Sequence, residues 1–347
     1  MMLIGTTKGL FVLEPNGGGW SKRGPFLRGQ SVAAVARDGD RLWAGGTSEH
    51  WGPTVWRSDD GGETWEEPEG GALRFPEDTG AKLRQVWQLV PSRDRLYAGV
   101  EPAALFVSDD GGTSFELVRG LWDHPHRSKW QPGGGGLCLH TVLPHPDDPD
   151  RMWIAVSAAG VYRTSDGGTT WEARNRGIVA PFLPDPEPPE FGQCVHKVDL
   201  HPSRPDTLFL QHHWGVYRSD DAGDSWQNIG SSLPSDFGFP VVVSPDDPDT
   251  AYVLPLTSDE FRCTVDGQCR VFRTADGGGS WEPLTKGLPQ EDAYLTVLRD
   301  GFSAGGPDEP GLFFGTRTGE VFASRDGGER WDLAAAHLPP VQVVRAV

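Results

Sequence analysis

An eight-residue motif recurs along the chain and limits the folds that the chain can adopt. Six copies fit the pattern Ser/Thr-x-Asp-x-Gly-x-x-Trp/Phe, at 58–65, 108–115, 164–171, 219–226, 274–281 and 324–331. A degenerate seventh copy ends at Trp20 and keeps only Gly17 and the tryptophan. The closing aromatic residues stand 45 to 56 residues apart. A repeat of this length is typical of propellers and solenoid arrays, in which one small structural unit is copied along the chain.

Each copy has the composition of a tight turn between two strands. A short alternating run, such as Gly-Val-Tyr-Arg at 160–163, precedes the motif and is typical of a strand. The Asp and Ser/Thr side chains can accept hydrogen bonds from N–H groups of the turn, and glycine permits a positive φ. The closing tryptophan can bury its ring between neighbouring sheets. We therefore assign a structural role to the motif aspartates, which are Asp60, Asp110, Asp166, Asp221, Asp276 and Asp326.

The repeated motif resembles the Asp-box, or BNR, repeat of sialidase-like propeller proteins. The resemblance covers nearly the whole chain and implies an all-β propeller. Proteins with this repeat include sialidases, xyloglucan hydrolases, sorting receptors and photosystem assembly factors. The resemblance therefore implies an architecture, and it leaves the reaction open.

The two ends of the chain predict how the propeller closes. Six blades are expected at about 30–67, 84–118, 137–174, 194–229, 238–284 and 293–334. Residues 1–23 contain three strands without an inner strand, and residues 340–346 contain one strand without a box. A seventh blade shared between these two segments would leave no free sheet edge. We therefore predict a seven-bladed β-propeller that forms a single domain over 1–347. Six blades with two loose ends is the alternative.

Composition disfavours several kinds of partner. The 347 residues carry a formal net charge of -18 and contain no Lys/Arg cluster, which argues against nucleic-acid phosphates and anionic membranes as partners. No apolar run approaches the ~20 residues of a membrane-spanning helix, and the first residues are typical of two strands and not of a signal peptide. We expect a cytoplasmic protein with four reduced cysteines, in which Cys263 and Cys269 could pair only after export.

The predicted blade order separates two faces of the molecule. Turns between the second and third strands, and the connections between blades, lie opposite the Asp boxes. Three of these connections are long, at 67–83, 119–136 and 175–193. Long loops on a rigid scaffold commonly carry function. The face opposite the Asp boxes is therefore the candidate functional face.

Histidines are frequent on that face. His140 and His196 occupy the same position in adjacent inner strands, each within a Cys-x-His pair. They could act as general acid and base, or join His126 and His213 in binding Zn, Fe, Cu or Ni. Alternatively, His140 and His196 donate hydrogen bonds to backbone carbonyls beside small buried cysteines.

Further side chains of this face are candidates for binding or catalysis. The ligand-binding candidates are histidine, tryptophan and arginine residues, namely His50, Trp51, His124, Arg127, Trp130, His213 and Trp214. A glycosidase needs two carboxyl groups ~5 to 10 Å apart across a sugar, and the acidic candidates are Glu101, Asp123 and Glu260. Arg84, Arg127 and Arg262 could bind an anionic substrate. For His50 and His213 a structural role in a capped loop is the alternative.

The residues depart from the sialidase pattern. No Phe/Tyr-Arg-Ile-Pro stretch is present, and Tyr294, at the start of a predicted inner strand, has no evident glutamate partner. Sialidase activity is therefore not expected. Three functions remain. The first is binding of a small or sugar-like ligand at the His/Trp-lined channel mouth, with glycosyl-hydrolase-like catalysis as its extension. The second is a metal-dependent enzyme, and the third is a non-catalytic platform for a protein partner.

Overall fold

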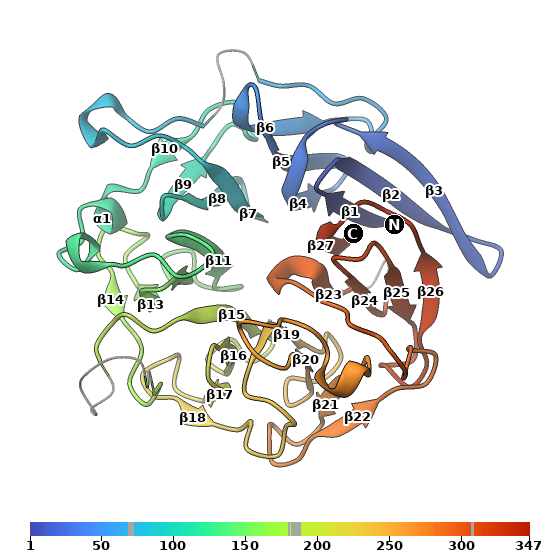
Figure 1. Ribbon diagram of the computed structural model, residues 1–347. Coiled ribbons are helices and arrows are strands. Elements are labelled where there is room, and N and C mark those ends of the chain that lie inside the picture. The colour runs from blue at the N-terminus through green and yellow to red at the C-terminus, as the bar shows by residue number, and fades with distance from the viewer. Residues whose placement is uncertain (69–72, 180, 182–188, 307–308) are drawn as a thin grey trace.

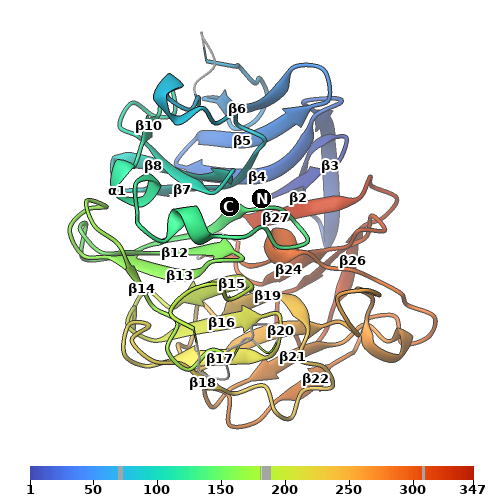
Figure 2. The same cartoon turned by 60° about the vertical axis from the view of Figure 1, so that its left-hand side comes forward.

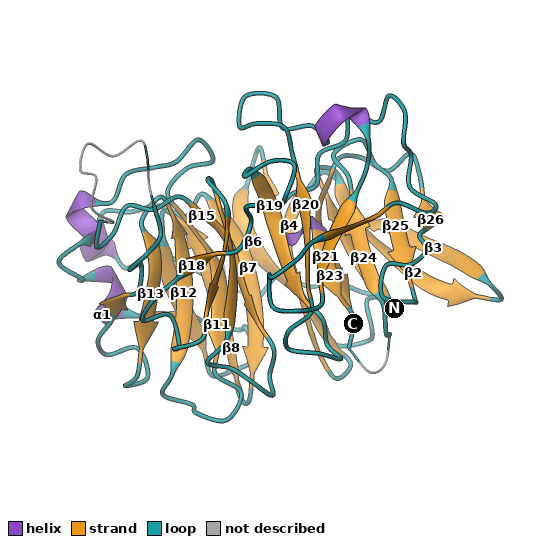
Figure 3. Cartoon of the chain, turned by 90° about the horizontal axis from the view of Figure 1, so that it is seen from below, coloured by secondary structure: helices purple, strands orange, loops and turns teal. Residues whose placement is uncertain are grey.

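Seven small antiparallel sheets surround a central axis (Figure 1). The computed structural model describes residues 1–68, 73–179, 181, 189–306 and 309–347. Parts of two predicted connections, 69–72 within 67–83 and both 180 and 182–188 within 175–193, lie outside the described residues. Viewed from the side, the strands form one layer, and loops extend above and below it (Figure 3).

Each sheet is one blade, and its strands follow one another from the axis outward. The first three blades contain β4 (Ser31–Asp38), β5 (Arg41–Ser48) and β6 (Gly52–Ser58); β7 (Gln85–Ser92), β8 (Arg95–Glu101), β9 (Ala104–Ser108) and β10 (Glu116–Leu117); and β11 (Cys138–Pro144), β12 (Met152–Ser157), β13 (Gly160–Thr164) and β14 (Glu172–Ala173). The next three contain β15 (Val195–Leu200), β16 (Leu208–His212), β17 (Val216–Ser219) and β18 (Gln227–Asn228); β19 (Gly238–Val243), β20 (Ala251–Pro255), β21 (Val271–Thr274) and β22 (Glu282–Leu284); and β23 (Phe302–Ala304), β24 (Leu312–Gly315), β25 (Val321–Ser324) and β26 (Asp332–Ala335). The helical segments are α1 (Arg119–Trp122), η1 (Glu77–Thr79), η2 (Arg127–Lys129), η3 (Val265–Gly267) and η4 (Arg299–Gly301).

The seventh blade joins the two ends of the chain, as predicted. Its order is β27 (Val341–Ala346), β1 (Met2–Thr6), β2 (Gly9–Asn16) and β3 (Gly19–Phe26). The C-terminal strand β27 pairs antiparallel with β1 and supplies the missing inner strand. The two ends of the chain therefore lie close together (Figure 2), and the seven-bladed closure is confirmed.

Glycines allow neighbouring blades to approach closely. In four second strands, one glycine faces the inner strand of the next blade, and an added Cβ would lie 2.5 to 2.8 Å from its atoms. These glycines are Gly5, Gly45, Gly99 and Gly315, which face Val32, Val86, Leu139 and Val341. At Gly5 and Gly99 the nearest atom is a backbone oxygen, which no side-chain rotation can move. The close packing between these blades therefore requires glycine at the four positions.

The Asp boxes are turns closed by their own side chains, as predicted. In the box of blade four, Ser219 Oγ donates to Asp221 Oδ1 at 2.8 Å and accepts from the Gly223 N–H at 2.9 Å. The Ser225 N–H and hydroxyl both donate to the Asp221 carboxylate. In the next box, the Ser280 N–H and the hydroxyl groups of Ser280 and Thr274 lower the pKa of Asp276 to about 2. The box aspartates therefore act as ionised structural acceptors.

Blade six differs from its prediction. Its inner strand was expected to begin near 293, but β23 begins at Phe302. The Ala293 N–H donates to Gly267 O, and Leu295 O accepts from the Thr264 N–H, so this segment pairs with the region of η3 instead. Tyr294 is consequently 54% exposed and does not start an inner strand. None of the helices in the described residues is long and apolar enough to cross a membrane.

Candidate functional site

The inner strands of six blades carry a β-bulge at the same position. In each, the pairing with the second strand shifts by one residue. In five of these strands the residue at the shift is Gln342, Ala33, Trp87, His140 or His196. In β19 the shift covers both Phe239 and Pro240. A bulge turns a side chain out of the regular alternation of a strand. Because the inner strands surround the axis, this ring of bulges can direct one side chain per blade toward the channel.

Five of these six side chains line one pocket of about 240 Å³, which we call the channel pocket. Only His140 is not among its lining residues. The residues two positions before three of the bulges also line it, namely Gln85, Cys194 and Phe237. The remaining lining residues come from the 119–136 connection, from Ser157 at the end of β12, from the loops after β16 and β20, and from residues 298–300 at η4. A wider hollow of about 650 Å³ lies at the box end of the channel, where Lys197 and Asp300 form an ion pair at 2.6 Å.

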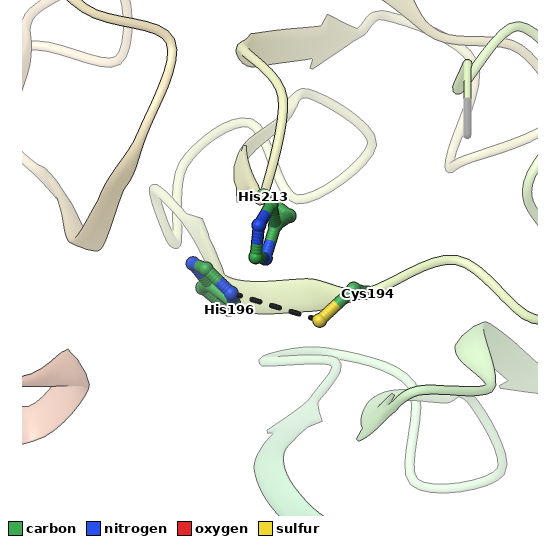
Figure 4. A group of neighbouring side chains, drawn as sticks. All are labelled: Cys194, His196 and His213. Carbon is green, nitrogen blue, oxygen red and sulfur yellow. Dashed lines mark hydrogen bonds between the residues drawn. The ribbon is translucent and has the colours of Figure 1, made fainter. Parts of the chain in front are cut away.

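Cys194, His196 and His213 converge in this pocket (Figure 4). One ligand atom from each lies within 4.8 Å of the other two, the single such group found among the described residues. His196 Nδ1 hydrogen-bonds to Gly238 O at 2.6 Å, and its Nε2 lies 3.7 Å from Cys194 Sγ. His213 Nε2 lies 3.4 Å from Asp259 Oδ2. The backbone carbonyl thus fixes the His196 ring and leaves its Nε2 toward the cysteine.

The pocket holds both imidazoles in the neutral form at neutral pH. Burial, reinforced by the positive charge of Arg299, keeps the pKa of His196 well below its ordinary value. Burial also lowers the pKa of His213, although Asp259 partly opposes the shift. Burial raises the pKa of the Cys194 thiol. Neutral imidazoles can bind a metal or accept a hydrogen bond from a ligand.

His140 does not join this group. Its Nε2 lies 3.0 Å from Val195 O and its Nδ1 lies 3.0 Å from Thr141 Oγ1, and the side chain is fully buried. Both ring nitrogens are therefore engaged within the protein. This matches the alternative expectation of a hydrogen bond to a backbone carbonyl, and the structure does not place His140 to bind a metal or a substrate.

His126 and three of the ligand-binding candidates lie in a separate cluster on blade three. His124 Nε2 contacts Trp171 O at 3.1 Å, and Trp130 donates to Tyr162 OH at 2.8 Å. His126 contacts the same hydroxyl at 3.2 Å and stacks on Phe191. Arg127 donates to Ala103 O and covers the Trp122 ring at 3.6 Å. These contacts attach the 119–136 loop to blades two and three, so the four predicted metal-binding histidines are not brought together.

The acidic candidates do not line the channel pocket. Glu101 accepts a hydrogen bond from Trp87 Nε1 at 3.3 Å, so it lies behind a pocket wall. Asp123 and Glu260 are exposed and absent from the lining. Two other acids do line it, Asp259 and Asp300.

The remaining ligand-binding candidates lie around His213 or in blade one. Trp214 packs against His213 with ring centres 4.1 Å apart, outside the pocket lining. His50 is exposed in the turn between β5 and β6. Trp51 follows it, is 90% exposed, and borders a separate groove near Phe75.

Two arginines contribute positive charge to the pocket. Arg299 is 8% exposed, and its guanidinium carbon lies 5.4 Å from the centre of the Trp87 ring and 5.5 Å from that of Phe239. Its Nε has no hydrogen-bond partner among the described residues. Arg262 lies 5.6 Å from the centre of the same Phe239 ring. Sequence reasoning included Arg262 among possible anion-binding residues but missed Arg299.

Comparisons with known proteins agree with this architecture. Residues 56–67 match the family described as BNR/Asp-box repeat. The chain is similar to the oligoxyloglucan-reducing end-specific xyloglucanase of Emericella nidulans, at 28% identity over 237 residues, and to the probable enzyme of that name from Neosartorya fischeri, at 26% over 180 residues. These matches cover 60% and 50% of this chain, but 28% and 19% of the fungal proteins, so the chain spans less than a third of their length.

Solved structures show the same fold. The GH74 xyloglucanase from Xanthomonas campestris superimposes with a TM-score of 0.68 at 19% identity, over 96% of this chain and 52% of that one. YCF48 bound to D1 peptide superimposes with a TM-score of 0.58 at 14% identity, over 88% of this chain and 82% of that chain. The chain is therefore an Asp-box propeller whose fold resembles that of GH74 xyloglucanases.

Proposed function

We propose that the protein binds a small sugar-like ligand in the channel pocket. The observation that carries this proposal is the convergence of five bulged side chains, each from a different blade, on one cavity. Trp87, Phe237 and Phe239 offer aromatic surface, and Gln85 offers an amide group. Gln342 offers its amide oxygen, because its Nε2 already donates to Ser31 Oγ at 2.7 Å. Apolar walls with a few polar groups that fix orientation are typical of small-molecule sites. The fungal relatives are named for action on oligoxyloglucan, which supports a carbohydrate as the ligand class.

Binding, and not hydrolysis, is the function proposed. Asp259 and Asp300 are the two carboxylates that line the pocket among the described residues. Lys197 holds Asp300 in a buried ion pair at 2.6 Å, and Arg345 lies 3.7 Å from the same oxygen. Asp300 is therefore held by ion pairs within the protein and is not free to act on a ligand. Asp259 then has no second carboxyl group across the pocket, as a glycosidase would need.

Replacing Trp87 by alanine should weaken sugar binding about tenfold, since it removes one aromatic wall. Saturation-transfer NMR with a panel of monosaccharides and short oligosaccharides would identify ligands, and titration would give their affinities. Asp221→Ala is the control, because it lies in a box on the opposite face. This variant should lose about 3 kcal/mol of stability through three lost hydrogen bonds, and its melting temperature should fall by about 4 °C. Sugar binding that survives Trp87→Ala but disappears in Asp221→Ala would contradict the proposal.

A transition-metal site is the second candidate, favoured by the convergence of Cys194, His196 and His213. Three ligands and one open position toward a cavity are typical of catalytic zinc sites. Protein loaded with Co²⁺ should then show visible absorption and a thiolate-to-cobalt charge-transfer band. Cys194→Ser should abolish the charge-transfer band, whereas Cys263→Ser, at a free cysteine outside the pocket, should keep it. Equal spectra for the two variants would exclude this site.

The remaining hypothesis, a platform for a protein partner, is supported by the likeness to YCF48 bound to D1 peptide. Exposed aromatic side chains are present in the loops of blades one, five and six, at Trp51, Phe261 and Tyr294. Phe261 and Tyr294 contact each other, with ring centres 6.2 Å apart. Peptide binding that Trp87→Ala leaves intact would favour this function over sugar binding.

A further inference from the structure

The buried guanidinium of Arg299 is the least expected group in the channel pocket. The protein has a net charge of -18, yet this arginine is 8% exposed and forms no ion pair within 4.0 Å among the described residues. Burying a charge without a partner is costly. Such a group is expected where its partner arrives from outside.

The nearby carboxylates are already engaged by other groups. Asp300 pairs with Lys197 at 2.6 Å. Glu101 accepts from Trp87 and lies 3.8 Å from Arg84. Asp259 faces His213 at 3.4 Å. None of these carboxylates forms an ion pair with Arg299. The lining holds two arginines and two aspartates, and because Asp300 is already paired with Lys197, Arg299 is left without a counter-charge of its own.

The surroundings of Arg299 hold the guanidinium in place. The rings of Trp87 and Phe239 lie within 5.5 Å of its central carbon, in the range of cation–π contact. Arg262 lies over the same Phe239 ring, and its Nε donates to Asp259 O at 2.8 Å. Gly134 and Gly135 also line the pocket beside the two guanidinium groups. Two positive groups therefore border one small cavity.

We infer that the ligand carries a carboxylate and that Arg299, assisted by Arg262, binds it. This inference rests on the proposed sugar-binding function and names the class of ligand as a sugar acid, such as a uronic acid. A planar guanidinium matches a carboxylate through two parallel hydrogen bonds. The aromatic walls and the amides of Gln85 and Gln342 then contact the sugar ring.

Matched pairs of sugars test the inference directly. D-Glucuronate and D-glucose differ only in the carboxylate at C6, and D-galacturonate and D-galactose form a second pair. Titration followed by NMR should show at least tenfold tighter binding of each acid than of its neutral partner. Added salt should weaken binding of the acid and leave that of the neutral sugar unchanged.

Arg299→Gln should abolish the preference for the acid while retaining weak binding of the neutral sugar. Trp87→Ala should weaken both members of a pair, since it removes an aromatic wall that contacts the sugar ring. Arg84→Gln is the matched control, because it removes the same charge from a side chain that is 74% exposed and does not line the pocket. If Arg299→Gln fails to fold, Arg262→Gln, at an exposed side chain, should reduce the preference instead.

The outcomes separate the two proposals. Equal binding of acid and neutral sugars, both weakened by Trp87→Ala, would overturn the carboxylate inference and leave the sugar-binding proposal standing. A preference that survives Arg299→Gln would also overturn the inference. Inorganic phosphate that binds as tightly as glucuronate, in an Arg299-dependent manner, would replace the sugar acid with a simple anion. Absence of binding by every sugar tested would overturn both proposals.

Discussion

Replacing Gly99 by valine should lower the free energy of unfolding by about 3 kcal/mol or more. A Cβ at this position would lie 2.5 Å from Leu139 O and 2.7 Å from Leu139 Cδ2, in the inner strand of the next blade. The oxygen belongs to the backbone of β11, so the overlap can be relieved only if blades two and three separate. Urea unfolding followed by circular dichroism would measure the loss.

Gly306→Ala is the control for this substitution. No atom lies within 4 Å of a Cβ added there, and the residue has no positive φ. Its stability should remain within about 0.5 kcal/mol of the wild type. A loss below about 1 kcal/mol in Gly99→Val would mean that the blades can shift relative to each other without cost, contrary to the packing described above.

Lowering the pH from 7 to 5 should destabilise the protein by about 2 kcal/mol for each buried histidine that stays neutral in the fold, and His140 and His212 are two such residues besides His196. Burial, followed by the charges of Arg299 and Lys197, keeps the pKa of His140 well below its ordinary value of 6.5. Burial lowers the pKa of His212 to about 3. The unfolded chain takes up protons on these rings below pH 6.5, whereas the folded chain does not. Stability is therefore full above pH 6.5 and declines as the pH falls toward the folded pKa values, by up to about 1.4 kcal/mol per pH unit for each ring.

Urea unfolding at several pH values would measure this slope. His140→Gln should reduce the slope by up to about 1.4 kcal/mol per pH unit, since one buried ring is removed. His50→Gln is the control, because His50 is exposed and its environment changes little on unfolding. The Asp boxes lose their stabilising effect only between about pH 4 and pH 2, so they do not contribute in this range. A slope unchanged in His140→Gln would show that the ring is protonated in the folded protein.

The architecture was predictable because each copy of the motif marks a fixed point within a blade. Each box marks the end of a third strand and the start of a fourth, so counting boxes counts blades. The incomplete segments at the two ends have complementary strands, and the pairing of β27 with β1 follows from them. The predicted position of the inner strand in blade six was wrong. The backbone of Ala293 and Leu295 found partners near η3, a contact between distant segments that no local pattern reveals.

The site was predictable only in part. The equivalence of His140 and His196 identified the correct strand position, yet one ring points into the pocket and the other bonds to Val195 O. Trp87 and Phe239 occupy the same position in their blades, but they stand 21 and 35 residues before their boxes, against 24 and 23 for His140 and His196. The spacing to the box therefore does not identify them. Arg299 offered no such signal, because η4 interrupts the regular pattern in blade six.

The ring of bulges places side chains of the channel pocket on strands whose other residues pack the blades together. Among the bulged side chains, Ala33 and Trp87 belong to none of the hydrophobic clusters of the described residues, so an exchange there alters the cavity with little effect on the cores, whereas Phe239 packs within one of these clusters. The ligand that the pocket recognises can therefore change through a substitution in one blade, while the seven-bladed fold is kept.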